Sequence, residues 1–156
     1  MANSVVAIRT GGAADRAFVE RLGKRTVMDS VPVARKPDPS DVLHSFDRLL
    51  AIVDRQSHVS FIAERDGVPI GFLLLLDDLP DEVTSEPQAF IAYMAVERGE
   101  RGQGVGSMLL RAAEDAARQK GLPYVTLMVT EDNGAARALY DGAGFTTERR
   151  LLCKRL

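Results

Sequence analysis

Three glycines spaced two residues apart constrain this chain more than any other feature. Gly102, Gly104 and Gly106 lie between an apolar run, FIAYMAV (90–96), and a stretch with helical periodicity, SMLLRAAEDAARQK (107–120). An apolar run followed by glycines and a helix is typical of a strand-to-helix junction in an α/β protein. Because glycine has no Cβ atom, the sequence predicts that something approaches the backbone closely at this junction.

The start of a helix favours a phosphate group as that partner. Its first N–H groups are unpaired and carry partial positive charge, and Arg98 and Arg101 would add charge-assisted contacts. A plain turn with close helix packing is the alternative. A nucleoside triphosphate loop would require a lysine before Ser107, which follows Gly106 directly. A dinucleotide fingerprint would require a third glycine at position 107 and an acid about twenty residues further on, and both are missing.

The rest of the chain predicts alternating strands and helices. The expected order is a strand (5–10), a helix (13–28), a proline-rich loop (29–40), a helix capped by Ser40, two strands around an Asp66-Gly67 turn (58–78), the strand 90–96, the helix after the glycines, a strand (124–129), a short helix capped by Asp132 or Asn133, and a last strand (145–156). Leu73–Leu76 is apolar on both faces, as expected for a strand covered on both sides.

Composition limits the class of protein. The chain has 156 residues, 46% of them hydrophobic and 27% charged, and a formal net charge of −2, so we expect one globular domain (4–156) that binds neither nucleic acid nor membrane. Its one cysteine, Cys153, is expected to be a small buried residue in a cytoplasmic protein. The N-terminus lacks the layout of a signal peptide, and no residues show metal-ligand spacing.

Two segments resemble the GNAT superfamily of N-acetyltransferases. VERGERGQGVGSMLL (96–110) is similar to its acyl-CoA-binding motif, Arg/Gln-x-x-Gly-x-Gly/Ala, at Arg101, Gly104 and Gly106. NGAARALYDGAGF (133–145) is similar to its second motif, with matches at Asn133, Ala136, Leu139, Tyr140, Gly144 and Phe145. The order of elements also agrees over nearly the whole chain. The resemblance implies a single α/β (α+β) domain with a mixed, mostly antiparallel sheet flanked by helices.

The resemblance also implies a cofactor site for acetyl-CoA as co-substrate. Backbone amides of the loop would hold its pyrophosphate; these belong to Arg101, Gly102, Gln103, Gly104, Val105, Gly106 and Ser107. The strand before the loop would carry a bulge and splay from the next strand. The pantetheine arm would lie in that gap along Met94, Ala95 and Val96, and Asn133 would also contact the cofactor.

The catalytic groups follow from the same resemblance. Tyr140 would protonate the departing CoA sulfur and contact the cofactor, and the backbone N–H at or next to Met94 would stabilise the oxyanion. Without the resemblance, the pattern favours a core tyrosine at Tyr140 and a simple helix cap at Asn133. FIAYMAV contains no acid that could serve as a general base. Tyr93, acting through water, Glu131 and ordered water alone are the remaining options for the amine proton, because Glu97 is expected to face solvent.

The predicted function is transfer of an acetyl group from acetyl-CoA to a primary amine by direct attack. The expected partner is a small-molecule or peptide amine, and a homodimer is possible. A non-catalytic acyl-CoA-binding sensor is the alternative, and a nucleotide-dependent oxidoreductase is disfavoured by the missing fingerprint. Five acids between residues 77 and 86 are either a negative rim for a cationic amine or an ordinary solvated loop.

Overall fold

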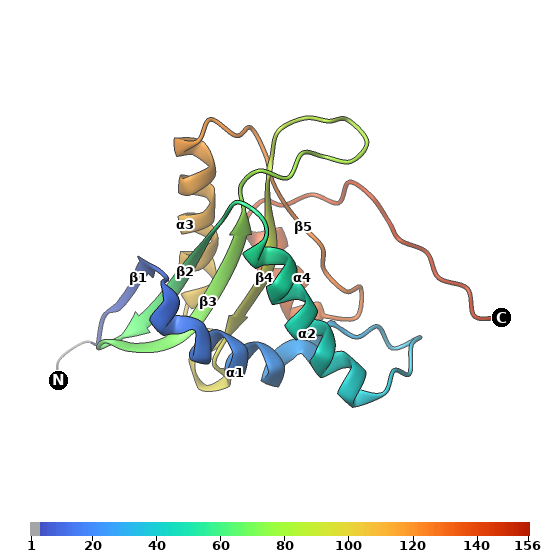
Figure 1. The fold of residues 1–156 in the computed structure, drawn as a ribbon, viewed down its shortest axis with the longest axis horizontal. Helices are drawn as coiled ribbons and strands as arrows, with labels where there is room; N and C mark the ends of the chain where they lie inside the picture. Colours follow the sequence, from blue (N-terminus) through green and yellow to red (C-terminus); the bar gives the residue numbers. More distant parts are fainter. Residues whose placement is uncertain (1–3) are drawn as a thin grey trace.

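The computed structural model describes residues 4–156, and its centre is one five-stranded sheet (Figure 1). The strands are β1 (Val6–Thr10), β2 (His58–Arg65), β3 (Val68–Leu76), β4 (Ala89–Val96) and β5 (Val125–Leu127), and they lie in this order across the sheet. Neighbours pair antiparallel except β4 and β5, which are parallel. The mixed, mostly antiparallel sheet expected from the sequence is therefore confirmed.

Helices cover both faces of this sheet (Figure 1). α1 (Arg16–Thr26) and α2 (Pro39–Asp54) pack on one face, and α3 (Val105–Gln119) and α4 (Gly134–Gly142) pack on the other. Short 3-10 turns precede and follow α1, at η1 (Ala13–Asp15) and η2 (Val27–Ser30), and a third, η3 (Arg98–Glu100), follows β4.

Strand β3 shows why its sequence is apolar throughout. Leu74 and Leu76 belong to the core under α1 and α2, whereas Leu73 and Leu75 belong to the core under α3. All four are at most 5% exposed. Side chains alternate between the faces of a sheet, so a strand covered on both sides needs apolar residues at every position.

The predicted hairpin turn is confirmed, whereas the predicted cap of α2 is wrong by two residues. Asp66 and Gly67 have φ of 51° and 78°, the positive values that a tight two-residue hairpin turn requires. Helix α2 begins at Pro39, and Asp38 is its N-cap, because the Asp38 carboxylate accepts from the Ser40 backbone N–H at 2.8 Å. Proline suits the first helical position since its missing N–H would have no partner there.

The predicted last strand does not form, and this part of the sequence prediction is wrong. Residues 146–156 have no regular structure, and the chain end runs away from the sheet (Figure 1). Strand β5 is also shorter than expected, with three residues, so it offers few backbone groups to an additional strand. Cys153, expected to be buried, is exposed for the same reason. Within residues 4–156 no helix combines the length and apolar character needed to cross a membrane.

Candidate acyl-CoA site

Strand β4 carries a bulge and then separates from β5. Leu74 pairs with Tyr93 and Leu75 pairs with Ile91, so Ala92 is one extra residue in β4. Pairing between β4 and β5 ends at Ile91, five residues before β4 itself ends. A bulge bends its strand and increases the local twist. The carboxyl-terminal half of β4 therefore has an edge that β5 does not occupy, as the resemblance implied.

The backbone groups of Met94 and Val96 lie on this open edge. The backbone N–H of Glu97 donates to the carbonyl oxygen of Ile70, at the start of the β3–β4 pairing, at 2.8 Å. In an antiparallel pair, successive residues of one strand direct their N–H and C=O alternately toward and away from the partner strand. Residues 93, 95 and 97 therefore bond to β3, whereas Met94 and Val96 direct their backbone groups to the open edge.

The glycine loop ends directly at the first turn of α3. Gly104 is the N-cap of this helix, and the first helical backbone bond runs from Met108 N–H to Gly104 C=O at 3.1 Å. The N–H groups of Val105, Gly106 and Ser107 precede that bond, so the helix supplies them with no acceptor. Three N–H groups at the start of a 15-residue helix form a site suited to a phosphate.

Glycine is needed at these three positions for two different structural reasons. Gly102 and Gly104 have φ of 75° and 82°, values that other residues rarely adopt, and a Cβ atom at either would meet no protein atom within 4 Å. At Gly106, by contrast, a Cβ atom would lie 2.9 Å from Cδ2 of Leu139. Gly106 therefore allows α4 to approach α3, and the space above Gly102 and Gly104 is open to a ligand.

Two side chains of the loop form hydrogen bonds to the protein around it. The Arg101 guanidinium donates from Nε to the carbonyl oxygen of Val96 at 3.1 Å. The side chain of Gln103 accepts from Arg65 at 3.1 Å and donates to the carbonyl of Gly99 at 3.1 Å. Arg65, at the end of β2, braces this loop, and sequence reasoning missed it because nothing in its local pattern indicates so distant a contact.

Tyr140 lies on α4, half-buried against the end of the second motif. Its ring meets that of Phe145 edge to face, with centroids 5.8 Å apart. Burial raises the pKa of the Tyr140 hydroxyl, and the nearby phenol of Tyr93 raises it further. Within residues 4–156 the Tyr140 hydroxyl makes no hydrogen bond to protein. It is therefore a protonated donor that is available to a ligand at neutral pH.

Tyr93 lies on β4 one residue beyond the bulge, and its ring is fixed by aromatic neighbours. Phe46 packs on it edge to face at 5.0 Å, and Phe72 stacks on it at 5.9 Å. The Tyr93 hydroxyl lies 2.9 Å from Oγ1 of Thr26. Burial raises the pKa of Tyr93 as well. The hydroxyl consequently keeps its proton near neutral pH.

Asn133 caps α4 and links two loops. Its side-chain oxygen accepts from the backbone N–H of Ala136 at 3.2 Å, and its amide nitrogen donates to the carbonyl of Asp29 at 3.5 Å. A hydrogen bond of 2.6 Å from the Thr130 hydroxyl to the carbonyl of Ser30 joins the same loops. The segment after α1 is thus tied to the segment before α4.

The two glutamates considered as bases lie in different surroundings. The Glu131 side chain is 86% exposed and pairs with Arg137 at 3.2 Å. Glu97, expected to face solvent, is only 22% exposed and lies 3.6 and 3.5 Å from Arg21 and Arg25. Both carboxylates therefore already neutralise cations of the protein.

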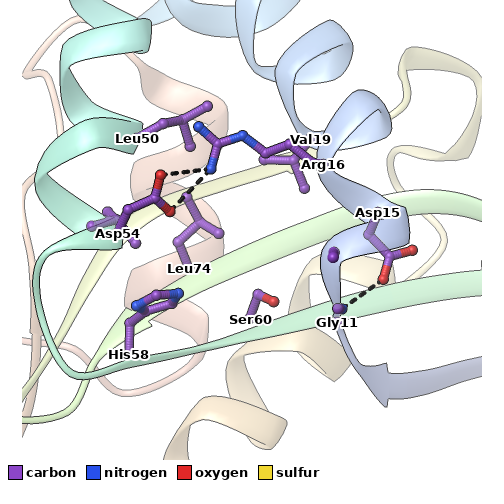
Figure 2. Close-up of a pocket in the computed structure, with 12 residues that line it drawn as sticks. Gly11, Asp15, Arg16, Val19, Leu50, Asp54, His58, Ser60 and Leu74 are labelled. Carbon is purple, nitrogen blue, oxygen red and sulfur yellow. Dashed lines mark hydrogen bonds and ion pairs between the residues drawn. The ribbon is translucent and has the colours of Figure 1, made fainter.

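A separate pocket of about 260 Å³ lies between the start of α1 and the end of α2 (Figure 2). Arg16 and Asp54 form an ion pair of 2.9 Å at its rim, with His58 and Ser60 from β2 nearby. Its lining includes none of the site residues expected from the sequence. The phosphate-suited loop and this pocket are therefore different places on the molecule.

Comparison with known protein families shows which family this chain belongs to. The model of the acetyltransferase (GNAT) family matches residues 27–145, which is more than half of the sequence. The chain belongs to the GNAT family of acetyltransferases.

Particular relatives resemble only part of the chain. A mycothiol acetyltransferase of Thermobispora bispora is 37% identical over 86 residues, which cover 55% of this chain and 29% of the relative. An N-alpha-acetyltransferase 30 of Schizosaccharomyces pombe is 30% identical over 59% of this chain and 60% of its own length. The chain thus matches less than two thirds of either relative's length.

Solved structures agree over the whole fold. A putative acetyltransferase from Pyrococcus furiosus superimposes with a TM-score of 0.83 at 22% identity, covering 97% of this chain and 100% of its own. The aminoglycoside N-acetyltransferase AAC(6')-Iy, in complex with a bisubstrate analogue of CoA, gives a TM-score of 0.69 at 24% identity, with 98% and 99% covered. At these identities the likeness concerns the fold.

Proposed function

We propose that this chain is an N-acetyltransferase that moves an acetyl group from acetyl-CoA to a primary amine by direct attack. The observation that supports this most is the continuity of two backbone surfaces, the edge of β4 that β5 does not occupy and the start of α3. The open edge of β4 at Met94 and Val96 leads to the free N–H groups at the start of α3. An extended arm ending in a pyrophosphate, as in CoA, matches a strand edge followed by an anion site.

Each part of acetyl-CoA would have a defined place. The pyrophosphate binds the backbone amides of residues 101–107 above Gly102 and Gly104, where no side chain intrudes. The pantetheine arm pairs with Met94 and Val96 past Ala95, and the N–H at Met94 stabilises the oxyanion that forms on the thioester carbonyl. Asn133 is the further cofactor contact carried over from the family motif.

The reaction then needs three proton transfers: the ammonium form of the substrate loses a proton before attack, the departing thiolate gains one, and the nitrogen loses another after attack. The amine must be neutral, yet an amine with a pKa near 10.4 is neutral in only about one molecule in 2,000 at pH 7. Its nitrogen attacks the carbonyl carbon, the C–S bond breaks, and the CoA thiolate takes a proton from Tyr140. Tyr93 keeps its own proton, so the proton lost by the amine leaves through water.

The acceptor amine is the part of the reaction that has to be found by experiment. We propose a panel of spermidine, a free amino acid, an aminoglycoside, a peptide with a free N-terminus and a lysine blocked at its α-amine, each assayed with acetyl-CoA for release of free thiol. Amine-dependent thiol release supports the enzyme. Binding of CoA without release for any class of amine would favour the alternative, an acyl-CoA-binding sensor, which the absence of a carboxylate in β4 also favours.

We propose a second copy of the chain as a partner. Leu151, Leu152 and Leu156 are 87–110% exposed on the segment that leaves the fold. This segment carries four cations, and Arg149 already binds Asp81 of the acidic loop between β3 and β4 at 2.8 Å. A basic apolar segment and an acidic loop on the same chain are complementary, so two copies can cover each other's exposed leucines.

A further inference from the structure

The hydroxyl of Thr26 has a direction that the surrounding atoms determine. Thr26 is the last residue of α1 and is 9% exposed. Its Oγ1 lies 2.9 Å from the carbonyl oxygen of Leu22 and 3.2 Å from that of Gly23. A carbonyl oxygen only accepts hydrogen bonds, so the single hydroxyl hydrogen of Thr26 points back into its own helix.

This direction fixes the proton of Tyr93. The 2.9 Å contact between Thr26 Oγ1 and Tyr93 Oη needs one donor, and Thr26 has no second hydrogen to give. Tyr93 is therefore the donor. The result is a directed chain from the Tyr93 hydroxyl to the Thr26 hydroxyl to the Leu22 carbonyl, in which each bond polarises the next.

The ring of Tyr93 is held so that this bond persists. Phe46 and Phe72 pack against the ring, and Phe46 is itself enclosed by protein, with 1% exposed. With its proton directed at Thr26, the Tyr93 oxygen presents only lone pairs to the rest of its surroundings. Tyr93 is also the residue directly before Met94 on β4, just beyond the bulge, so it lies next to the backbone N–H proposed to stabilise the oxyanion.

We infer that Thr26 is a positioning residue that makes Tyr93 a hydrogen-bond acceptor for the N–H of the substrate amine. This inference rests on the proposed function and deepens it. An amine that donates an N–H to the Tyr93 oxygen keeps its own lone pair free for the thioester carbonyl. As the nitrogen attacks and becomes positive, its N–H becomes a stronger donor, so this bond is tighter in the transition state than in the ground state.

The opposite arrangement would inhibit the reaction. A Tyr93 hydroxyl free to rotate would donate to the amine lone pair, which is the electron pair that must attack. Thr26 thus matters through the direction of one proton rather than through contact with substrate.

Thr26→Val tests the inference, because valine keeps the shape of threonine and removes the acceptor. Using the amine of the panel that wild type acetylates fastest, we expect kcat to fall by about tenfold while KM for acetyl-CoA is unchanged. Thr26→Ser, which keeps the hydroxyl, should restore the rate. In a Tyr93→Phe background, Thr26→Val should add no further loss, since there is no proton left to direct.

Two results would overturn the inference. One is a Thr26→Val enzyme as fast as wild type; the other is an equal loss in the Tyr93→Phe background, which would mean a structural role. A second measurement needs no variant: in protein with labelled tyrosine, NMR should show the Tyr93 hydroxyl proton close to the Thr26 methyl group, and a proton directed elsewhere would refute the chain. Failure of the proposed function is distinct, because wild type itself would then release no thiol.

Discussion

At the scale of single residues, the two phenols of the proposed site have different surroundings. Tyr93 is bound to Thr26 and enclosed by aromatic rings, whereas the Tyr140 hydroxyl has no protein partner among residues 4–156. The raised pKa of each keeps it protonated at neutral pH. A phenol with a free proton is suited to be a donor, and a phenol whose proton is engaged is suited to be an acceptor.

Replacing Tyr140 by phenylalanine should slow turnover without weakening cofactor binding. We expect kcat to fall about 100-fold, the scale of general acid catalysis, with the Kd for CoA unchanged, because the phosphate site is built from backbone. Tyr124→Phe is the matched control, since Tyr124 is 47% exposed and its hydroxyl donates to Glu86. Unchanged kcat under saturating conditions in the Tyr140 variant would remove the general acid from the mechanism.

The dependence of kcat on pH is a second test of Tyr140 as the general acid. The pKa of the Tyr140 hydroxyl lies above the ordinary value of 10, so the residue is fully protonated at neutral pH and loses its proton only as the pH rises above 10.

The roles of single residues were only partly predictable from sequence. The resemblance to the family's second motif pointed to Tyr140 and Asn133, whereas the bond between Thr26 and Tyr93 joins residues 67 apart and depends on where α1 ends.

At the scale of elements, the position of Tyr93 depends on how closely α1 and α2 pack. A Cβ atom at Gly23 of α1 would lie within 1.9–2.5 Å of the ring of Phe46 on α2, so glycine is what allows that ring to reach Tyr93. The sequence contained a signal for this contact, because a glycine inside a helical stripe needs a reason. Only the three-dimensional arrangement identifies Phe46 as that reason.

Gly23→Ala should therefore destabilise the protein although alanine is the better helix former. We expect a loss of about 1–3 kcal/mol from overpacking, which lowers Tm by roughly 3–8 °C in a chain of this size. Gly142→Ala in α4 is the control, because a Cβ atom there meets nothing within 4 Å, and its Tm should stay the same or rise. Equal Tm changes for both variants, measured by calorimetry, would show that Phe46 has room to move.

The bulge in β4 belongs to the same scale and was predictable only by resemblance. The sequence FIAYMAV alone does not distinguish a regular strand from one that has a bulge, with Ala92 as the extra residue relative to β3. The consequence for function is nevertheless large, since the bulge and the end of β5 decide that Met94 and Val96 direct their backbone groups toward an edge that β5 does not occupy.

At the scale of the whole molecule, the sheet and its helices follow the predicted order, and the chain end does not. Residues 145–156 have the composition of a strand, but within one chain they find no continuous edge to pair with. Sequence patterns show a capacity for strand formation and carry no information on whether a partner edge is present.

Removing residues 150–156 should change the oligomeric state. We expect the full chain to have about twice the mass of a 17.0 kDa monomer in light scattering after size-exclusion chromatography, and the shortened chain to be monomeric with its Tm retained. Arg150→Glu combined with Lys154→Glu should have the same effect by reversing charge opposite the acidic loop. A monomeric full chain would refute the proposed partner.

The proposed function requires that the loop at the start of α3 binds the pyrophosphate of acetyl-CoA. Thermal unfolding with matched concentrations of acetyl-CoA, CoA, NADH and ATP measures this binding. At one hundred times Kd a ligand stabilises by about 2.7 kcal/mol, which raises Tm by roughly 5–10 °C. We expect this shift with acetyl-CoA and CoA alone. Gly104→Glu should abolish it, whereas Gly121→Glu, with a similar positive φ at the other end of α3, should keep it. A protein whose Tm is unaffected by CoA, or is raised by NADH, would show that the loop does not bind the pyrophosphate of acetyl-CoA.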